Sequence, residues 1–139
     1  MKKNESITKI MSTDVKTVHI GQKISDVRHI ICESEIDHVP VLDGTKLAGL
    51  ISATDLMKLN VVINGADEHS IDAMIDQQFT IKEIMNTNIT SIKEVETIRQ
   101  ATHILTKGKF HCVPVVNDSN EVVGIVTMTD LIRYLDAQY

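Results

Sequence analysis

Residues 49–55 read GLISATD, and residues 124–130 read GIVTMTD. Each stretch has a glycine, two apolar residues, a hydroxyl-bearing residue in fourth place, and a final Thr-Asp pair. A hydroxyl residue followed three positions later by an acidic one is typical of a capped helix start. Because the layout occurs twice in 139 residues, we infer that the chain contains two copies of one structural unit.

The similarity continues on the N-terminal side of both stretches. Ile10-Met11 is answered by Ile84-Met85, and Val39-Pro40-Val41 is answered by Val113-Pro114-Val115, in both cases 74 residues later. The two glycines are 75 residues apart, so one residue has been inserted between the Val-Pro-Val motif and the glycine. Turn residues fill that interval, and a surface turn tolerates an insertion.

The repeat divides the chain into parts, which we place at residues 7–58, 59–79 and 80–136. The first and last are the two units, and the middle part is a connector. We expect the three parts to form one compact module.

The pattern of apolar and turn residues in each unit predicts the order strand, helix, strand, strand, helix. In the first unit, a strand is expected at 15–18 and a helix from Ile24, with Ser25-Asp26 near its start. The Val-Pro-Val strand should turn at Asp43-Gly44 into a hairpin partner. In the connector, a turn is expected at Asn64-Gly65. An amphipathic helix should follow it, because apolar residues recur at helical spacing: Ile71, Met74, Ile75 and Phe79.

Composition excludes several classes of protein. The net charge of −5 argues against a general nucleic-acid binder, and 3% aromatic residues without tryptophan leave no platform for base stacking. Two cysteines without a CxxC pair suit a reducing compartment. The N-terminal MKKNESITKIM has no apolar run typical of a signal peptide, and no stretch is long enough to span a membrane. We expect a soluble cytoplasmic protein.

The ordered motifs resemble those of the CBS-domain family. IMSTDVKTV, HVPVLD and GLISATD are answered by IMNTNITSI, CVPVVN and GIVTMTD, and the resemblance covers about Ile7 to Leu135. It implies an α+β fold in which two β-α-β-β-α units are related by pseudo-twofold symmetry, often called a Bateman module. It also implies a regulatory role in signal transduction, usually as a homodimer. AMP, ADP, ATP or S-adenosylmethionine would bind in the cleft between the units, and no cofactor is required.

The repeated stretch suits a nucleotide chemically. We interpret Gly49 as allowing close backbone approach beside a tight turn. A hydroxyl of Ser52 or Thr127 would lie near phosphate at the start of a helix, where backbone N–H groups point outward. Asp55 or Asp130 would accept hydrogen bonds from the two ribose hydroxyls. Simple helix capping explains the same residues, and the two interpretations are compatible.

The resemblance implies further ligand contacts by position. Thr54 and Thr129 belong to the same helix starts. In the first unit the other contacts are Lys16, Ile36, Asp37, His38 and Leu50. In the second unit they are Thr90, Phe110, His111, Cys112 and Ile125. Apart from the resemblance, Lys58 and Arg133 lie one helical turn beyond the aspartates, where they could supply positive charge to a phosphate, although we favour simple solvent exposure for both. We favour the second unit as the ligand site, because the acidic side chain of Asp37 disfavours a nearby phosphate.

Three other kinds of function are weighed against ligand binding: a metal site, an enzyme and an interaction module. His38 and Cys112 occupy equivalent positions and, with His111, suggest a metal site, but HxxxH, HExxH and CxxC spacings are absent. Adjacent residues of a strand point to opposite faces, so His111 and Cys112 make a poor nucleophile–base pair, and we expect no catalytic residues and no enzyme. A ligand-free dimerisation or protein-interaction module is the main alternative. The sequence leaves open the ligand, the number of occupied sites and the effector protein.

Overall fold

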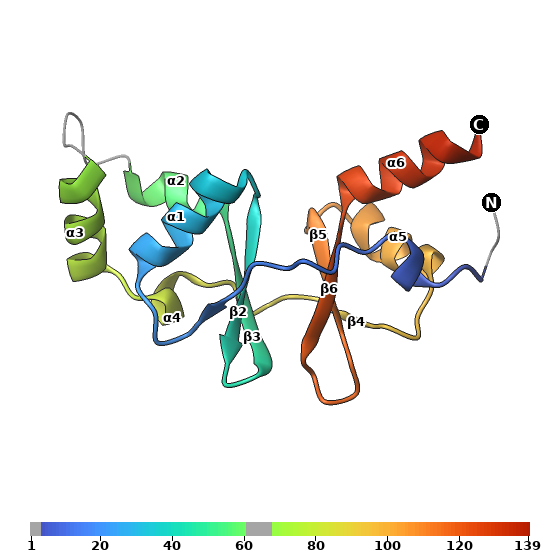
Figure 1. Cartoon of the computed structure of the whole chain (residues 1–139), viewed down its shortest axis with the longest axis horizontal. Coiled ribbons are helices and arrows are strands. Elements are labelled where there is room, and N and C mark those ends of the chain that lie inside the picture. Colours follow the sequence, from blue (N-terminus) through green and yellow to red (C-terminus); the bar gives the residue numbers. More distant parts are fainter. Residues whose placement is uncertain (1–3, 61–67) are drawn as a thin grey trace. The chain divides into compact units, whose positions relative to one another are not determined.

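The computed structural model describes residues 4–60 and 68–139. The chain forms two compact units, which we name after the helices that they contain: α2, Ala53–Asn60, and α6, Met128–Gln138. The α2 unit consists of Lys16–Gly44 and Ala48–Asn88. The α6 unit consists of Met1–Val15, Thr45–Leu47 and Ile89–Tyr139. Figure 1 shows the helices and strands of each unit.

The α2 unit contains a three-stranded sheet in the order β1-β2-β3. Its elements are β1 (Val18–His19), α1 (Ile24–Ser34), β2 (His38–Asp43), most of β3 (Lys46–Ser52), α2, α3 (Glu68–Gln78) and α4 (Ile81–Ile84). β1 runs parallel to β2 and places Val18 opposite Val41. Gly44, with a φ of 62°, lies in the left-handed region at the turn between β2 and β3, which confirms the predicted turn.

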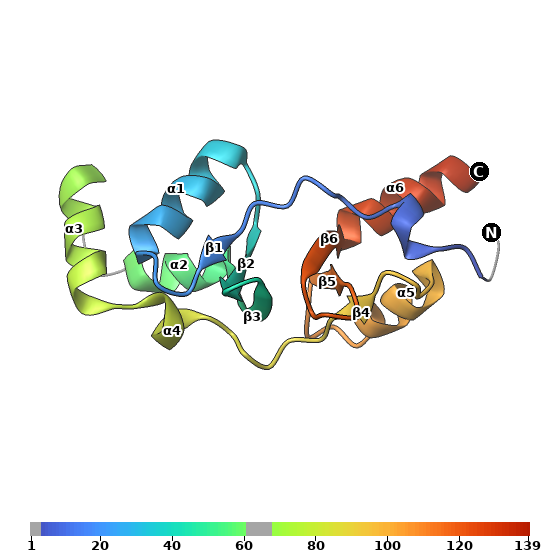
Figure 2. The same ribbon diagram turned by 60° about the horizontal axis from the view of Figure 1, so that its bottom comes forward.

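The α6 unit repeats this plan with a sheet in the order β4-β5-β6. Its elements are a short 3₁₀ helix (Ile7–Lys9), β4 (Ile92–Lys93), α5 (Ile98–Thr106), β5 (Cys112–Val116), β6 (Val122–Thr127) and α6. β4 is parallel to β5, and β5 is antiparallel to β6. In Figure 2, α5 lies alongside β4 and β5. The α+β fold expected from the sequence is confirmed.

Each unit has its own apolar core. The core residues come from strands, where inward-facing side chains alternate, and from helices, where they recur every three or four residues. In the α2 unit the buried members are Val18, Ile24, Val27, Val39, Val41, Ile51, Leu56, Ile75 and Ile81. In the α6 unit they are Ile7, Ile92, Ile98, Ala101, Leu105, Val113, Val115 and Val126. The Val-Pro-Val motif of each repeat therefore forms the centre of a sheet.

The first helix of each repeat begins where the sequence predicts. α1 starts at Ile24, and the Asp26 carboxylate accepts a hydrogen bond of 3.0 Å from the Lys23 backbone N–H. α5 starts at Ile98 with a complete capping box, in which Thr97 and Gln100 satisfy each other's backbone N–H groups. These contacts satisfy donors that a helix start otherwise leaves without a partner.

The strand expected at 15–18 is shorter and later than predicted. Only Val18–His19 pairs with β2, and the equivalent strand of the second repeat is also two residues long. The physical reason is that residues up to Val15 are packed in the α6 unit. The backbone before Val18 is therefore not in place to continue the β1–β2 ladder.

The connector helix is α3, and its apolar stripe packs only in part. Ile75 is buried, and Ile71 and Phe79 pack against the core of the α2 unit, while Met74 is 39% exposed. Polar contacts to α1 complete the packing, since the Asp76 carboxylate accepts from the Ser25 hydroxyl at 2.6 Å. The turn expected at Asn64-Gly65 lies outside the described residues.

The segments that precede β1 and β4 pair with the last strand of the opposite repeat. In the α6 unit, the Ser12 N–H donates to the Ile125 carbonyl at 2.9 Å and the Ile125 N–H donates back at 3.0 Å. In the α2 unit, Asn86 and Leu50 exchange the same two bonds at 2.8 and 3.0 Å. The compact units therefore do not coincide with the sequence repeats.

This pairing confirms the close backbone approach expected at the repeated glycine and corrects the tight turn expected beside it. Gly49 lies inside β3, and it is needed because a Cβ atom there would lie 2.7 Å from Met85 Sδ and 3.1 Å from the Asn86 carbonyl oxygen. A Cβ at Gly124 would meet Met11 in the same way. The absent side chain makes room for the paired segment rather than for a tight turn.

Candidate functional site

The sixteen candidate residues separate into two sets of eight, one in each unit. The α2 set comprises Lys16, Ile36, Asp37, His38, Leu50, Ser52, Thr54 and Asp55. The α6 set comprises Thr90, Phe110, His111, Cys112, Ile125, Thr127, Thr129 and Asp130. Most members of each set surround the point where the last strand of the sheet passes into the following helix.

In the α6 unit, strand pairing brings the start of β5 to the end of β6. Cys112 lies opposite Thr127 in the antiparallel register, and the Met128 N–H donates to the His111 carbonyl at 3.2 Å. Cys112 is buried whereas His111 is exposed. The two adjacent residues thus point to opposite faces, and of the two His111 is the one exposed to solvent.

The start of α6 is a capping box made by Thr127 and Asp130. The Asp130 N–H donates to Thr127 Oγ1 at 3.2 Å, and the Thr127 N–H donates to Asp130 Oδ2 at 2.9 Å. Asp130 Oδ1 lies 3.8 Å from the guanidinium of Arg133, which is 77% exposed. One carboxylate oxygen therefore holds the helix start, while the other lies beside an exposed cation.

In the α2 unit, Ser52 and Asp55 form the equivalent box. Asp55 Oδ2 accepts from the Ser52 N–H and the Ser52 hydroxyl, both at 2.9 Å, and Ser52 Oγ accepts from the Asp55 N–H at 3.2 Å. The Ala53 N–H donates to the Asp37 carbonyl at 2.8 Å. The capping interpretation of both repeated stretches is thus confirmed, and the ligand role proposed for the same residues has to share these atoms.

The other candidates differ in how accessible they are. Lys16, Thr54, Thr90 and Thr129 are exposed, while His38 and Ile125 are half-buried. Ile36 and Phe110 pack against the cores of their units, and Leu50 is buried. Packing alone therefore accounts for Ile36, Phe110 and Leu50.

Four residues at these sites were not predicted from the sequence: Met11, Ser12, Met85 and Asn86. They lie against the strands that lead into α6 and α2. The repeated Ile-Met pair, 74 residues apart, was the available signal. It marks the segment as part of the repeat but does not say which strand the segment joins.

The burial of Cys112 and the placement of the possible metal ligands both argue against thiol or metal chemistry at these sites. Burial raises the pKa of the Cys112 thiol to about 12, so the sulfur is protonated at neutral pH and is a poor nucleophile and metal ligand. Within residues 4–60 and 68–139, no three His, Cys, Asp or Glu side chains gather as a metal site would require. No helix in the same ranges is long and apolar enough to cross a membrane.

Comparison with known families agrees with the geometry. The sequence model of the CBS domain matches residues 7–61 and 81–137, which together make up most of the chain. The chain belongs to the CBS-domain family. It is a tandem CBS pair, and the two matched segments are the two sequence repeats.

Solved structures of CBS-domain pairs have the same fold. The pair from protein MJ0100, in complex with 5′-methylthioadenosine and S-adenosyl-L-methionine, is 28% identical, with a TM-score of 0.79 over 98% of this chain and 99% of that one. Protein MJ1225 of Methanocaldococcus jannaschii is 24% identical, with a TM-score of 0.80 over 97% of this chain and 49% of that one. The second likeness supports the fold alone.

Several curated relatives of this CBS pair are longer proteins named as enzymes. A homoserine O-acetyltransferase of Methanobrevibacter ruminantium is 29% identical over 94% of this chain and 24% of its own length. An L-aspartate semialdehyde sulfurtransferase of Methanocaldococcus jannaschii is 31% identical over 89% of this chain and 22% of its own length. The chain spans about a quarter of these proteins, so the similarity concerns their CBS portion.

Proposed function

We propose that this CBS pair is a regulatory module that binds adenosine-containing ligands at the starts of α2 and α6. The observation that carries the proposal is the arrangement at α6, where Asp130 holds the helix start with one carboxylate oxygen and has the other beside Arg133. The MJ0100 pair, similar over the whole chain, binds 5′-methylthioadenosine and S-adenosylmethionine, which share an adenosyl group.

The chemistry of the site divides between sugar and phosphate. A carboxylate has about four lone-pair sites, so Asp130 is able to keep its bond to the Thr127 N–H and accept from both ribose hydroxyls. The N–H groups in the first turn of α6 and the Arg133 guanidinium attract a phosphate. Asp55 and Ser52 would serve the same roles at α2.

The proposal assigns regulation rather than catalysis to the module. A ligand that binds a folded unit stabilises it. In this proposal the ligand also favours the conformation of the unit that an effector protein recognises. The protonated, buried thiol of Cys112 is not suited to attack a substrate. Adenine nucleotides and S-adenosylmethionine are intracellular metabolites, so the proposal places the module in the cytoplasm, in keeping with two free cysteines.

The test begins with melting temperatures measured in AMP, ADP, ATP and S-adenosylmethionine at millimolar concentration, with and without a divalent cation. A bound ligand raises the melting temperature through its preference for the folded state. An unchanged melting temperature with all four compounds would rule the proposal out.

Asp130→Asn is the residue-level test. The asparagine Oδ1 still accepts from the Thr127 N–H, so the helix start is kept, but the charged acceptor for the ribose hydroxyls is lost. Calorimetric affinity for the α6 site should fall about tenfold or more. Asp136→Asn, exposed on the same helix, is the matched control and should bind as the wild type does. Equal affinity in Asp130→Asn would exclude a ribose contact at this carboxylate.

A dimerisation module is the second candidate, and one feature of α6 favours it. Apolar side chains recur along one face of the helix and are exposed: Met128, Ile132, Leu135 and Tyr139. A homodimer would cover this face with the same face of a second copy. Ile132→Glu should then convert a dimer to a monomer in light scattering. Dimerisation without a response to any adenosine compound would favour this function over ligand sensing.

A further inference from the structure

Asp37 and His111 occupy the same structural position in the two units. Each is the residue just before the second strand of its sheet, and its carbonyl accepts a hydrogen bond from the first N–H of the helix that carries the site. The bonds are Ala53 N–H to Asp37 at 2.8 Å and Met128 N–H to His111 at 3.2 Å. Because these backbone contacts match, the two side chains stand beside equivalent helix starts.

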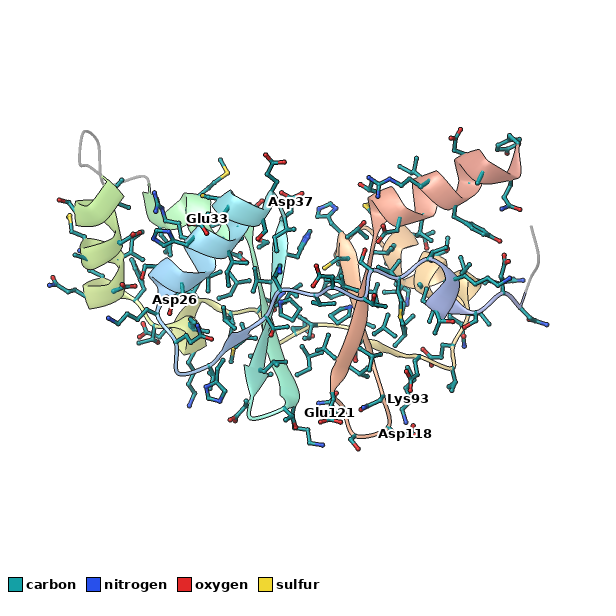
Figure 3. The ribbon with its side chains drawn as sticks, in the orientation of Figure 1. Asp26, Glu33, Asp37, Lys93, Asp118 and Glu121 are labelled. Atoms are coloured by element: carbon teal, nitrogen blue, oxygen red, sulfur yellow. The ribbon has the colours of Figure 1, made fainter. Side chains whose placement is uncertain are left out.

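Both side chains are open to solvent, so a ligand at the helix start is able to reach them. Asp37 and His111 are exposed residues, and Figure 3 shows Asp37 beside the upper end of β2. The His111 ring is turned toward α6, since its Nδ1 lies 3.4 Å from Met128 Sδ. Neither side chain is needed to form the strand pairing or the capping box.

The residue before the second strand is therefore a point at which the charges around the two helix starts differ. Asp55 matches Asp130, and Lys58 matches Arg133, one turn along each helix. The start of α2 has a second carboxylate in Asp37, where the start of α6 has an imidazole. Before β1 the α2 unit also has the positive charge of Lys16, where the α6 unit has the uncharged Thr90.

We infer that the residue at this position selects the charge of the ligand, so that the two units accept different adenosine derivatives. This inference rests on the proposed function. The α6 unit, with His111, accepts a 5′-phosphate such as that of AMP. The α2 unit, with Asp37, accepts an adenosyl group whose 5′ substituent is neutral or cationic, as in a thioether or a sulfonium.

The selection follows from elementary electrostatics. At a helix start that already has one carboxylate, a second carboxylate opposes a phosphate and attracts a sulfonium. An imidazole offers an N–H donor to a phosphate oxygen and, when protonated, a positive charge. A neutral thioether feels neither effect, so its affinity should be insensitive to the residue at this position.

The experiment compares AMP with 5′-methylthioadenosine, which share adenine and ribose and differ at the 5′ position. Each unit is isolated with the ribose variant of the other: Asp130→Asn leaves the α2 site, and Asp55→Asn leaves the α6 site. In the α2-only background, Asp37→His and Asp37→Asn should each raise AMP affinity about tenfold while leaving the affinity for 5′-methylthioadenosine unchanged. In the α6-only background, His111→Asp should lower AMP affinity by a similar factor.

The controls separate selection from folding and from the proposed function. The contacts to Ala53 and Met128 are made by the backbone carbonyls of residues 37 and 111, so the melting temperature without ligand should be the same in all three variants. Asp43→Asn, exposed at the other end of β2, should change neither affinity. If both compounds bind but the variants leave their affinity ratio unchanged, the inference is overturned and the proposed function stands. If neither compound binds the wild type, the inference is overturned, and the proposed function is decided by the melting temperatures in all four of its test compounds.

Discussion

The side chain of Met11 fills the space in which residue 124 would have a Cβ atom. A Cβ built on Gly124 would lie 2.6 Å from Met11 Sδ and 3.1 Å from the Ser12 carbonyl oxygen. The two residues belong to different sequence repeats and to the same compact unit. Met85 and Gly49 have the same relationship in the α2 unit. The glycine of each repeated stretch is thus explained by a segment of the other repeat.

Gly124→Ala should destabilise the α6 unit by about 1–3 kcal/mol, because the added methyl group forces Met11 and the paired backbone to move. Urea unfolding measures the effect. Gly21→Ala is the control, since its Cβ would meet only the His19 side chain at 3.4 Å and should change the free energy of unfolding by about 0.5 kcal/mol or less. Met11→Ala is then added to Gly124→Ala. If the double variant recovers none of the lost free energy of unfolding, the contact with Met11 is not the cause of the loss.

Asp72 should be the main polar anchor of the connector helix. Its carboxylate accepts from the Arg28 guanidinium at 2.9 Å and lies 2.6 Å from His29 Nε2, and the Arg28–Asp72 pair is mostly buried. Asp72→Ala should cost about 2 kcal/mol, since hydrogen bonds to charged groups are lost and Arg28 keeps its charge.

The comparison for Asp72 is an exposed ion pair. Lys93 Nζ lies 3.2 Å from Asp118 Oδ1, and the side chain of Asp118 is 94% exposed. Figure 3 labels both residues. Asp118→Ala should change the free energy of unfolding by about 0.5 kcal/mol or less. Equal losses in the two variants would show that burial of the Asp72 contacts adds nothing.

Stability should depend on pH through His29. The hydrogen bond to Asp72 raises the pKa of His29, and Glu33 acts in the same direction while burial opposes it. Because the pKa is higher in the folded state, the contribution is fully present below the unfolded pKa and is lost as pH rises through the folded pKa.

Urea unfolding of the wild type and His29→Gln across pH 5 to 9 measures this dependence. The stability difference between the two proteins should be largest at the acidic end and shrink as pH rises. His103→Gln, the equivalent exposed position in the second repeat, provides the control. A difference that stays constant with pH would show that the His29–Asp72 contact does not depend on protonation of His29, and one that grows with pH would show that folding lowers the pKa of His29.

The two cysteines should differ sharply in reactivity. Cys112 is buried and its pKa is raised to about 12, whereas Cys32 is exposed on α1. A thiol reagent added to the native protein at pH 8 should label one cysteine quickly, and the second only after denaturation. Mass spectrometry of the Cys32→Ser variant identifies the slow site. Rapid labelling of this variant in the native state would contradict the burial of Cys112.

Much of the fold is predictable because it depends on local spacing. Ile24 begins a helix, the Val-Pro-Val motifs form central strands, and the turn at Gly44 lies where the sequence indicates it. The helix caps at Thr127 and Ser52 follow from a hydroxyl placed three residues before an aspartate.

The candidate site is predictable only in part. The sequence places Asp130 and Asp55 at helix starts, but it does not show that one oxygen of each carboxylate is already occupied by a capping bond. Ile36 and Phe110 are apolar residues beside a strand, and only the packed structure shows them against a core. Their burial depends on neighbours supplied by other elements, which no local pattern specifies.

By itself, the sequence determined that the chain contains two copies of one unit, with a known order of helices and strands. Periodicity, turn residues and capping pairs act over a few residues, so they are visible without a structure. Only the tertiary structure decided that Met11-Ser12 pairs with β6 and Met85-Asn86 with β3. Backbone hydrogen bonds between distant segments leave no periodic signal in the sequence. The roles of Gly49 and Gly124 could be explained only when the segments packed against them were known.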